Sequence, residues 1–160
     1  MLKACAITAR FLRAATWRRG MARDHRRLRV FQEAHQLVVA IYQETKAFPR
    51  DEWFGMRAQL RRAAISVSSN LVEGSARRTL REYGNFVNIS RASAAEVEYL
   101  ASLALELGYL SRGTSQLLQR RCDQLIPQLE SLAQKLDVLT KAECATRRSR
   151  RSTQAREHNA

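Results

Sequence analysis

Residues 56–82 read MRAQLRRAAISVSSNLVEGSARRTLRE, and this stretch decides the fold class. Its apolar residues recur at steps of three or four, at Met56, Leu60, Ala63, Val67 and Leu71. That spacing places them on one face of an α-helix, whereas a strand alternates apolar and polar residues. We therefore predict a helix over about residues 56–73, ended by Gly74, because glycine is the usual residue just past a helix C-terminus.

A second helix begins at the end of the same stretch. Thr79 and Glu82 have the spacing of a capping box, in which each side chain accepts a hydrogen bond from the other residue's backbone amide. The apolar residues of this helix are Phe86, Ala94, Val97, Leu100, Ala104 and Leu107. We expect Gly108 to end it.

Upstream of this stretch, residues 28–48 predict another helix. Its stripe consists of Phe31, Ala34, Val38, Ile41 and Phe48, with Thr45 at the remaining step. Pro49 ends the helix, because the residue before a proline is pushed out of the helical region. The connection over residues 51–55 is short, so the two flanking helices have to pack antiparallel.

A fourth helix is predicted downstream, capped by Ser111 or Thr114 and ending near Thr140. Its near-heptad stripe consists of Leu118, Cys122, Leu125, Leu129, Leu132, Leu136 and Leu139. Pro127 lacks a backbone N–H, so we expect it to bend or locally disrupt this helix. Residues 141–160 lose the periodicity and are expected to form a disordered basic tail.

The composition agrees with a single all-α domain, an antiparallel up-and-down four-helix bundle over residues 28–140. Only six of the 160 residues are Gly and two are Pro, too few for a turn-rich sandwich. No apolar run approaches the roughly 18–20 residues of a membrane helix, so no membrane partner is expected. The three cysteines contain no C-x-x-C pair, which predicts neither a disulfide framework nor a zinc site and favours a reducing cytoplasm.

The formal net charge of +13 lies mainly at the chain ends. Residues 1–27 hold eight basic residues against one acidic residue, and residues 141–160 hold six against two. Basic ends attract nucleic acid or anionic surfaces without reading sequence; the alternative is a solubilising tail without a partner. Residues 1–20 also resemble a transit peptide, but we favour Met21 as the true start.

Six arginines in the middle of the chain are the candidate nucleic-acid-binding residues. Arg57, Arg61 and Arg62 share nearby turns of the helix over residues 56–73, and Arg77, Arg78 and Arg81 follow Gly74. We expect them to form a basic patch at one end of the bundle, where guanidinium groups hold phosphates bidentately. The alternative is that Glu73, Glu82 and their neighbours neutralise them in ordinary surface ion pairs.

Asn70 and Glu73, just before Gly74, are polar residues on a largely apolar segment. An amide on a helix seam commonly sets the register or the assembly state, and we favour that role over a ligand site. Trp53 and Phe54 are candidates for a protein interface.

Catalytic patterns are missing from the sequence. No Glu-x-x-His pair, His-Glu-x-x-His motif or repeated Glu-x-x-Glu pair occurs, so we expect no metal, no cofactor and no enzyme activity. The remaining enzyme alternative is a small ribonuclease that uses Arg29 and His35.

The segments together resemble the 23S rRNA intervening-sequence proteins, a bacterial four-helix-bundle family. The resemblance rests on LRVFQEAH (28–35), FP (48–49), QLRRAA (59–64), SVSSNLVEGS (66–75), EVE (96–98) and LGYL (107–110). Ser68, Ala76, Ala92 and Pro127 depart from the pattern of the family, which leaves local helix geometry open.

That resemblance implies a ring-shaped homopentamer in a family whose members mostly have no established biochemical activity. A related branch, the accessory variability determinant of diversity-generating retroelements, is a basic pentamer that partners a reverse transcriptase and its RNA. The function we predict is a non-catalytic accessory or scaffold protein that binds RNA or DNA through phosphate contacts. The alternative is a protein-interaction ring without a nucleic-acid role.

Overall fold

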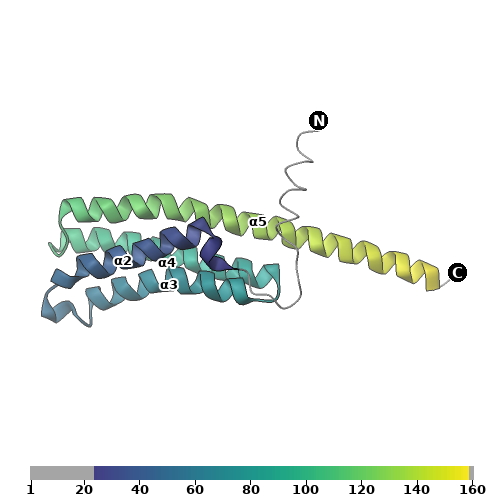
Figure 1. Cartoon of the computed structure of the whole chain (residues 1–160), viewed down its shortest axis with the longest axis horizontal. Helices are drawn as coiled ribbons and strands as arrows, with labels where there is room; N and C mark the ends of the chain where they lie inside the picture. Colours follow the sequence, from purple (N-terminus) through teal and green to yellow (C-terminus); the bar gives the residue numbers. More distant parts are fainter. Residues whose placement is uncertain (1–23, 159–160) are drawn as a thin grey trace, which may run out of the picture.

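The computed structural model describes residues 24–158, with side chains up to residue 146 (Figure 1). The predicted basic segment 1–27 and the proposed start at Met21 lie outside the described residues, apart from residues 24–27. Four α-helices carry the fold: α2 (Arg29–Glu44), α3 (Met56–Ala76), α4 (Leu80–Glu106) and α5 (Arg112–His158). Three short 3₁₀ turns complete the described part of the chain: η1 (His25–Arg27), η2 (Thr45–Ala47) and η3 (Arg50–Glu52).

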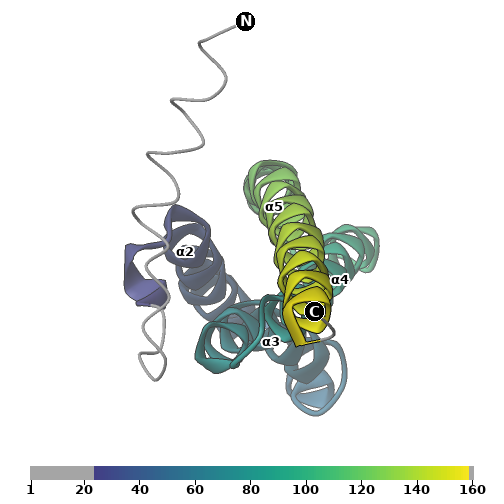
Figure 2. The ribbon, with the colours of Figure 1, turned by 90° about the vertical axis from the view of Figure 1, so that its right-hand side faces the viewer.

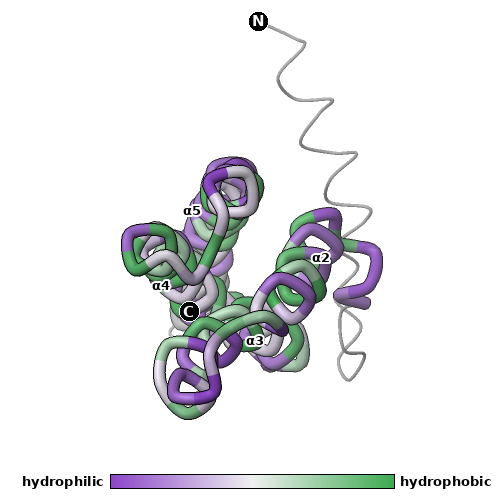
Figure 3. The backbone as a smooth tube through the Cα atoms, turned by 90° about the vertical axis from the view of Figure 1, so that its left-hand side faces the viewer, coloured by the Kyte–Doolittle hydropathy of each residue, from purple (hydrophilic) through white to green (hydrophobic). Residues whose placement is uncertain are grey.

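The helices form an antiparallel four-helix bundle, which confirms the predicted fold class. Around the bundle, α2 packs against α3 and α5, and α4 packs against the same two helices. An end-on view shows the four helices surrounding a common axis (Figure 2). Each helix carries both hydrophobic and hydrophilic residues (Figure 3), as the amphipathic helices of a bundle require. No helix among the described residues is long and apolar enough to cross a membrane.

The core consists largely of the apolar stripes found in the sequence. Leu60, Ala63, Val67 and Leu71 of α3 are buried, as are Leu118, Cys122, Leu125 and Leu129 of α5. Burial raises the pKa of the Cys122 thiol to about 12, so this side chain packs as a small hydrophobe.

Two predicted helix ends are confirmed by their hydrogen bonds, and a third is confirmed only in part. The helix predicted over 28–48 ends as an α-helix at Glu44, a 3₁₀ turn continues to Ala47, and Phe48 is extended before Pro49, with φ −62° and ψ 144°. Gly108 has a φ of +74°, and the amides of Gly108 and Tyr109 donate to the carbonyls of Leu105 and Ala104, which is a Schellman motif. At the start of α5, the Ser111 hydroxyl accepts from the Thr114 amide at 3.1 Å, so Ser111 is the cap.

The prediction that Gly74 ends its helix is wrong. The helix α3 continues to Ala76, and Gly74 is a buried helical residue. A Cβ atom at this position would lie 2.6 Å from Tyr83 Cδ2 and 2.8 Å from Phe86 Cβ. Gly74 therefore allows the backbone of α3 to approach the side chains of α4. Glycine is needed here because it has no side chain, and not because the backbone adopts a positive φ.

The expected disordered tail after Thr140 is also wrong. The helix α5 runs through Pro127 without a break and ends at His158, so that it projects far beyond the other three helices (Figure 1). Residues 128–158 contain no Gly or Pro and are rich in Leu, Ala, Gln, Lys and Arg. Once α5 is nucleated on the bundle, each further residue of this kind extends the helix at little cost.

Removal of the cap on α4 is expected to destabilise the fold. The Thr79 hydroxyl accepts from the Glu82 amide at 3.1 Å, and the Glu82 carboxylate accepts from the Thr79 amide at 3.2 Å. Thr79→Ala should lower the free energy of unfolding by about 1 kcal/mol, whereas Thr79→Ser, which keeps the hydroxyl, should change it by much less. Urea unfolding at pH 7 measures both, and equal losses in the two variants would refute the capping role.

The capping box also predicts a pH dependence. Hydrogen bonds from Thr79 lower the pKa of Glu82. The stability that Glu82 contributes is therefore present above the ordinary pKa of a glutamate and is lost as the pH falls through the lowered pKa of the folded state.

Candidate functional site

The six candidate arginines do not form the single patch that the sequence predicted. Arg57, Arg61 and Arg62 lie in the first two turns of α3, whereas Arg77, Arg78 and Arg81 follow its other end. Because an α-helix rises 1.5 Å per residue, residues 61 and 77 lie about 24 Å apart along the axis. The expectation failed because the first group lies at the start of α3 and the second lies past its end, so the length of this helix holds the two groups at opposite ends of the bundle.

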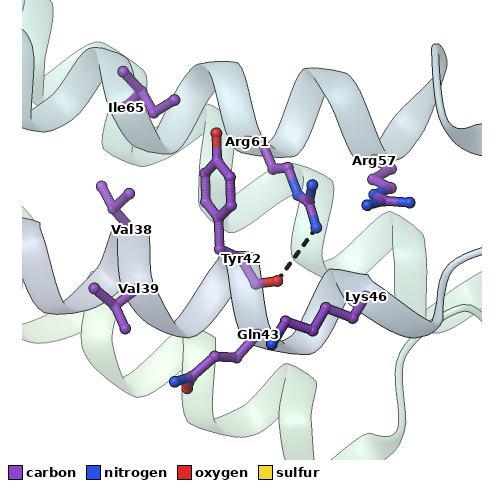
Figure 4. Close-up of a pocket in the computed structure, with 8 residues that line it drawn as sticks. All are labelled: Val38, Val39, Tyr42, Gln43, Lys46, Arg57, Arg61 and Ile65. Carbon is purple, nitrogen blue, oxygen red and sulfur yellow. Dashed lines mark hydrogen bonds between the residues drawn. The ribbon is translucent and has the colours of Figure 1, made fainter.

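Arg61 is held firmly between α2 and α3. Its Nε donates to Thr45 Oγ1 at 2.8 Å, and its guanidinium group lies 4.5 Å from the centre of the Tyr42 ring. A terminal nitrogen donates to the Tyr42 carbonyl at 3.3 Å (Figure 4). Burial, and then the neighbouring charge of Arg57, lower the pKa of Arg61. An arginine remains protonated despite such a shift, so Arg61 places a fixed positive charge at this seam.

Arg57 lies one helical turn from Arg61, towards the connection between α2 and α3. Its guanidinium group lies 5.0 Å from the centre of the Trp53 ring, and that of Arg50 lies 6.0 Å from the same ring. Arg62 is exposed and donates to Gln59 Oε1. This end of the bundle therefore combines arginines with an exposed aromatic ring.

An open groove of about 600 Å³ lies between α2 and α3. Figure 4 shows Val38, Val39 and Ile65 at one end of it and the cations Lys46, Arg57 and Arg61 at the other, with the Tyr42 ring between them. The sequence analysis missed this groove. The available signal was Val39 and Ile65, two apolar residues that fall outside the core stripes of their helices.

The second group of arginines is more exposed. Arg77 pairs with Glu73 at 3.3 Å and lies 4.4 Å from the centre of the Phe86 ring. Arg78 and Arg81 form no ion pair with any residue in the described part of the chain. The neutralisation alternative therefore holds for Arg77, which pairs with Glu73. Glu82 forms its hydrogen bonds with Thr79, and the charges of Arg77 and Arg78 contribute to its lowered pKa.

The three motif residues have three different environments. Asn70 Nδ2 donates to the Ser66 carbonyl at 2.7 Å and to Ser66 Oγ at 3.0 Å. Ser66 Oγ in turn lies 2.8 Å from Ser93 Oγ of α4. Asn70 thus supports a polar contact between α3 and α4, which agrees with a register role inside one chain. Glu73 is an exposed partner of Arg77, and Gly74 is a buried packing residue.

A second serine strengthens the same seam and was missed by the sequence analysis. Ser90 Oγ of α4 is buried and donates to the Val67 carbonyl of α3 at 2.8 Å. A small hydroxyl residue on an apolar stripe gives no distinct signal, because its partner is a carbonyl on another helix.

The described residues show no arrangement typical of a metal centre. Among the side chains that the structure describes, up to residue 146, no three His, Cys, Asp or Glu gather closely enough to hold a metal ion. His35, the histidine of the ribonuclease alternative, stacks on Phe31 with 6.3 Å between the ring centres.

Comparisons with known proteins identify the family. No curated protein matches the chain. A crystal structure of a protein of unknown function from the S23 ribosomal protein family of Bacteroides thetaiotaomicron VPI-5482 is similar, with a TM-score of 0.61 and 22% sequence identity. The similarity covers 65% of this chain and 97% of that protein, and at this identity it supports the fold. The family model of the 23S rRNA-intervening sequence proteins matches residues 26–131. With most of the chain matched and the bundle in place, this protein belongs to the 23S rRNA-intervening sequence protein family.

Proposed function

We propose that this protein is a non-catalytic, cytoplasmic scaffold that binds RNA or DNA through phosphate contacts. The observation that carries the proposal is that most of the candidate arginines form no ion pair within the described part of the chain. Among the described residues, Arg77 is the one member of the six candidate arginines that pairs with a carboxylate. Unpaired guanidinium groups are available to phosphates and release counterions when they bind them.

The placement of the arginines gives this scaffold two contact regions on each chain. One lies at the start of α3 around Arg57 and the other lies past its end around Arg78 and Arg81. We infer further that the chain assembles into a ring-shaped homo-oligomer, a pentamer as the family resemblance implies. Such a ring repeats both regions and suits an extended nucleic acid, and a reverse transcriptase is a partner in keeping with the retroelement branch.

A protein-interaction ring is the second candidate function, and one observation favours it. Phe54 is 92% exposed and follows Trp53, which is itself half-exposed. Large apolar side chains so exposed are typical of contact surfaces. A protein partner or a second copy would bury them, whereas phosphate contacts would not need them.

A salt series tests the nucleic-acid proposal. Full-length protein is titrated into labelled single-stranded and duplex RNA and DNA at several salt concentrations. We expect binding at physiological salt, about 0.15 M, with an affinity that falls steeply as salt rises. In the double variant Arg78→Gln/Arg81→Gln, the slope of log K against log salt should become shallower by about 2, one unit for each lost phosphate contact.

The matched control is Arg91→Gln/Arg120→Gln, which removes two exposed arginines of α4 and α5 that lie outside both regions. It should change the slope less than the test variant does. Lack of binding at physiological salt would overturn the proposal and leave the protein-interaction ring. Equal slopes in the test and control variants would assign binding to the overall charge instead of the two regions.

A further inference from the structure

We propose that the groove between α2 and α3 is a subsite for single-stranded nucleic acid, which takes an unpaired base at its apolar end and the adjoining phosphate at its cationic end. This inference rests on the proposed function and narrows it. It assigns the class of ligand, a single strand, and the place where one nucleotide of that strand is held.

The groove is divided into two chemical halves. Val38, Val39 and Ile65 form an apolar end on which a flat ring loses contact with water (Figure 4). Lys46 and Arg57 stand at the other end, together with Arg61. The residues that line the groove include no aspartate or glutamate, so the cationic end attracts an anion.

The cations are available and partly positioned in advance. Neither Lys46 nor Arg57 forms an ion pair with any residue that the structure describes. Arg61 is held by Thr45 and by the Tyr42 carbonyl, so little side-chain freedom remains to be lost when an anion binds. Charge complementarity therefore favours a phosphate group at this end.

The size of the groove suits one nucleotide of a longer strand. Its volume of about 600 Å³ lies within the range of pockets that hold small organic ligands. The groove is open to solvent, and exposed aromatic residues continue from it, because Arg57 lies over the ring of Trp53 and Phe54 follows. Aromatic rings beside arginines form the stacking platforms of proteins that bind single strands.

A duplex cannot use both the apolar end and the cationic end of the groove. Its bases are paired and stacked inside the helix, so it presents phosphates to the cations and nothing to the apolar end. An unpaired base uses both ends. The groove therefore predicts a preference for single strands that depends on apolar side chains as well as on charge.

The test separates the two ends with single substitutions in the full-length protein. Ile65→Asn makes the apolar end polar without changing any charge. Its control is Ile89→Asn on α4, outside the groove, because Ile65 is 43% exposed and Ile89 is 49% exposed. Thermal unfolding of both variants confirms that they are folded. The probes are a labelled 12-nucleotide oligouridylate, an abasic strand of the same length and an RNA duplex.

We expect Ile65→Asn to weaken oligouridylate binding about tenfold, because the base loses the apolar surface that it covers on Ile65. Binding of the abasic strand and of the duplex should stay unchanged, and Ile89→Asn should affect none of the three. In a Trp17→Phe background, which leaves Trp53 as the one tryptophan, oligouridylate should also change the Trp53 fluorescence.

The other possible results contradict either the groove proposal alone or the proposed function as well. If oligouridylate binds wild type and Ile65→Asn equally, the groove is not the subsite, while the proposed function stands. If no nucleic acid binds, both are wrong. If a 12-residue peptide of glutamate and phenylalanine binds instead and Ile65→Asn abolishes that binding, the groove accepts an acidic protein segment.

Discussion

Gly74→Val is expected to lower the free energy of unfolding by about 3 kcal/mol. The Cβ atom of the new side chain would lie 2.6 Å from Tyr83 Cδ2 and 2.8 Å from Phe86 Cβ, both closer than van der Waals contact allows. The Tyr83 ring is buried at 2% exposure, and the Cβ atom of Phe86 moves only with its backbone. Relief therefore requires α3 and α4 to separate, which also weakens the Ser66–Ser93 and Ser90–Val67 contacts between them.

The matched control is Gly84→Ala in α4. A Cβ atom at Gly84 would meet only Leu136 Cβ, at 3.8 Å, an ordinary contact. Alanine favours helix over glycine by up to about 1 kcal/mol, so this variant should be as stable as wild type or more stable. Urea unfolding followed by circular dichroism compares the three proteins. A Gly74→Val variant as stable as wild type would show that α3 and α4 are not in close contact at this point.

Leu118→Ala is expected to lower the free energy of unfolding by about 3 kcal/mol. Leu118 is fully buried in the core, where α5 packs on α2 and α4. The substitution loses the transfer free energy of the removed carbon atoms and leaves a cavity that the surrounding helices fill only in part.

Leu117→Ala is the control for this variant, since it makes the same chemical change one residue earlier in the chain. Leu117 is 37% exposed and should lose less than about 1 kcal/mol. All measurements use one fixed protein concentration, because the proposed ring would make stability depend on it. Equal losses at the two positions would contradict the orientation of α5 in the bundle.

The helices and the core were predictable because periodicity is a local property of the chain. The steps of three and four from Leu60 to Leu71 determine which side of α3 is apolar, whatever that side contacts. The same holds for Leu118, Leu125 and Leu129 of α5. The Thr79 cap was predictable for the same reason, since both partners lie within one helical turn.

Helix ends that depend on tertiary contacts were not predictable. Gly74 and Gly108 have the same local signal, but only Gly108 has a positive φ and ends a helix. The difference lies in Tyr83 and Phe86 of α4, which approach Gly74 so closely that no side chain fits there. The length of α5 was misjudged because the loss of an apolar stripe was interpreted as the loss of the helix.

The candidate site was predictable in its residue types and only partly in its arrangement. The arginines were found because an excess of charge is visible in any sequence. Their separation into two groups follows from the length of α3 and was already implied by the predicted range 56–73, because Arg57 lies in the first turn of that helix and Arg77 lies beyond its end. The groove was missed because its apolar end combines Val38 and Val39 of α2 with Ile65 of α3, residues that approach one another only after the helices pack.

By itself, the sequence determined the fold class, the apolar face of each helix, the capping box and the basic character of the protein. Each of these follows from residues close together in the chain, where helical geometry relates spacing directly to position. Only the tertiary structure decided the role of Gly74, the hydrogen bonds between α3 and α4, and the groove between α2 and α3 with its apolar and cationic ends. Those features are contacts between residues far apart in the chain, and their distances depend on how whole helices pack.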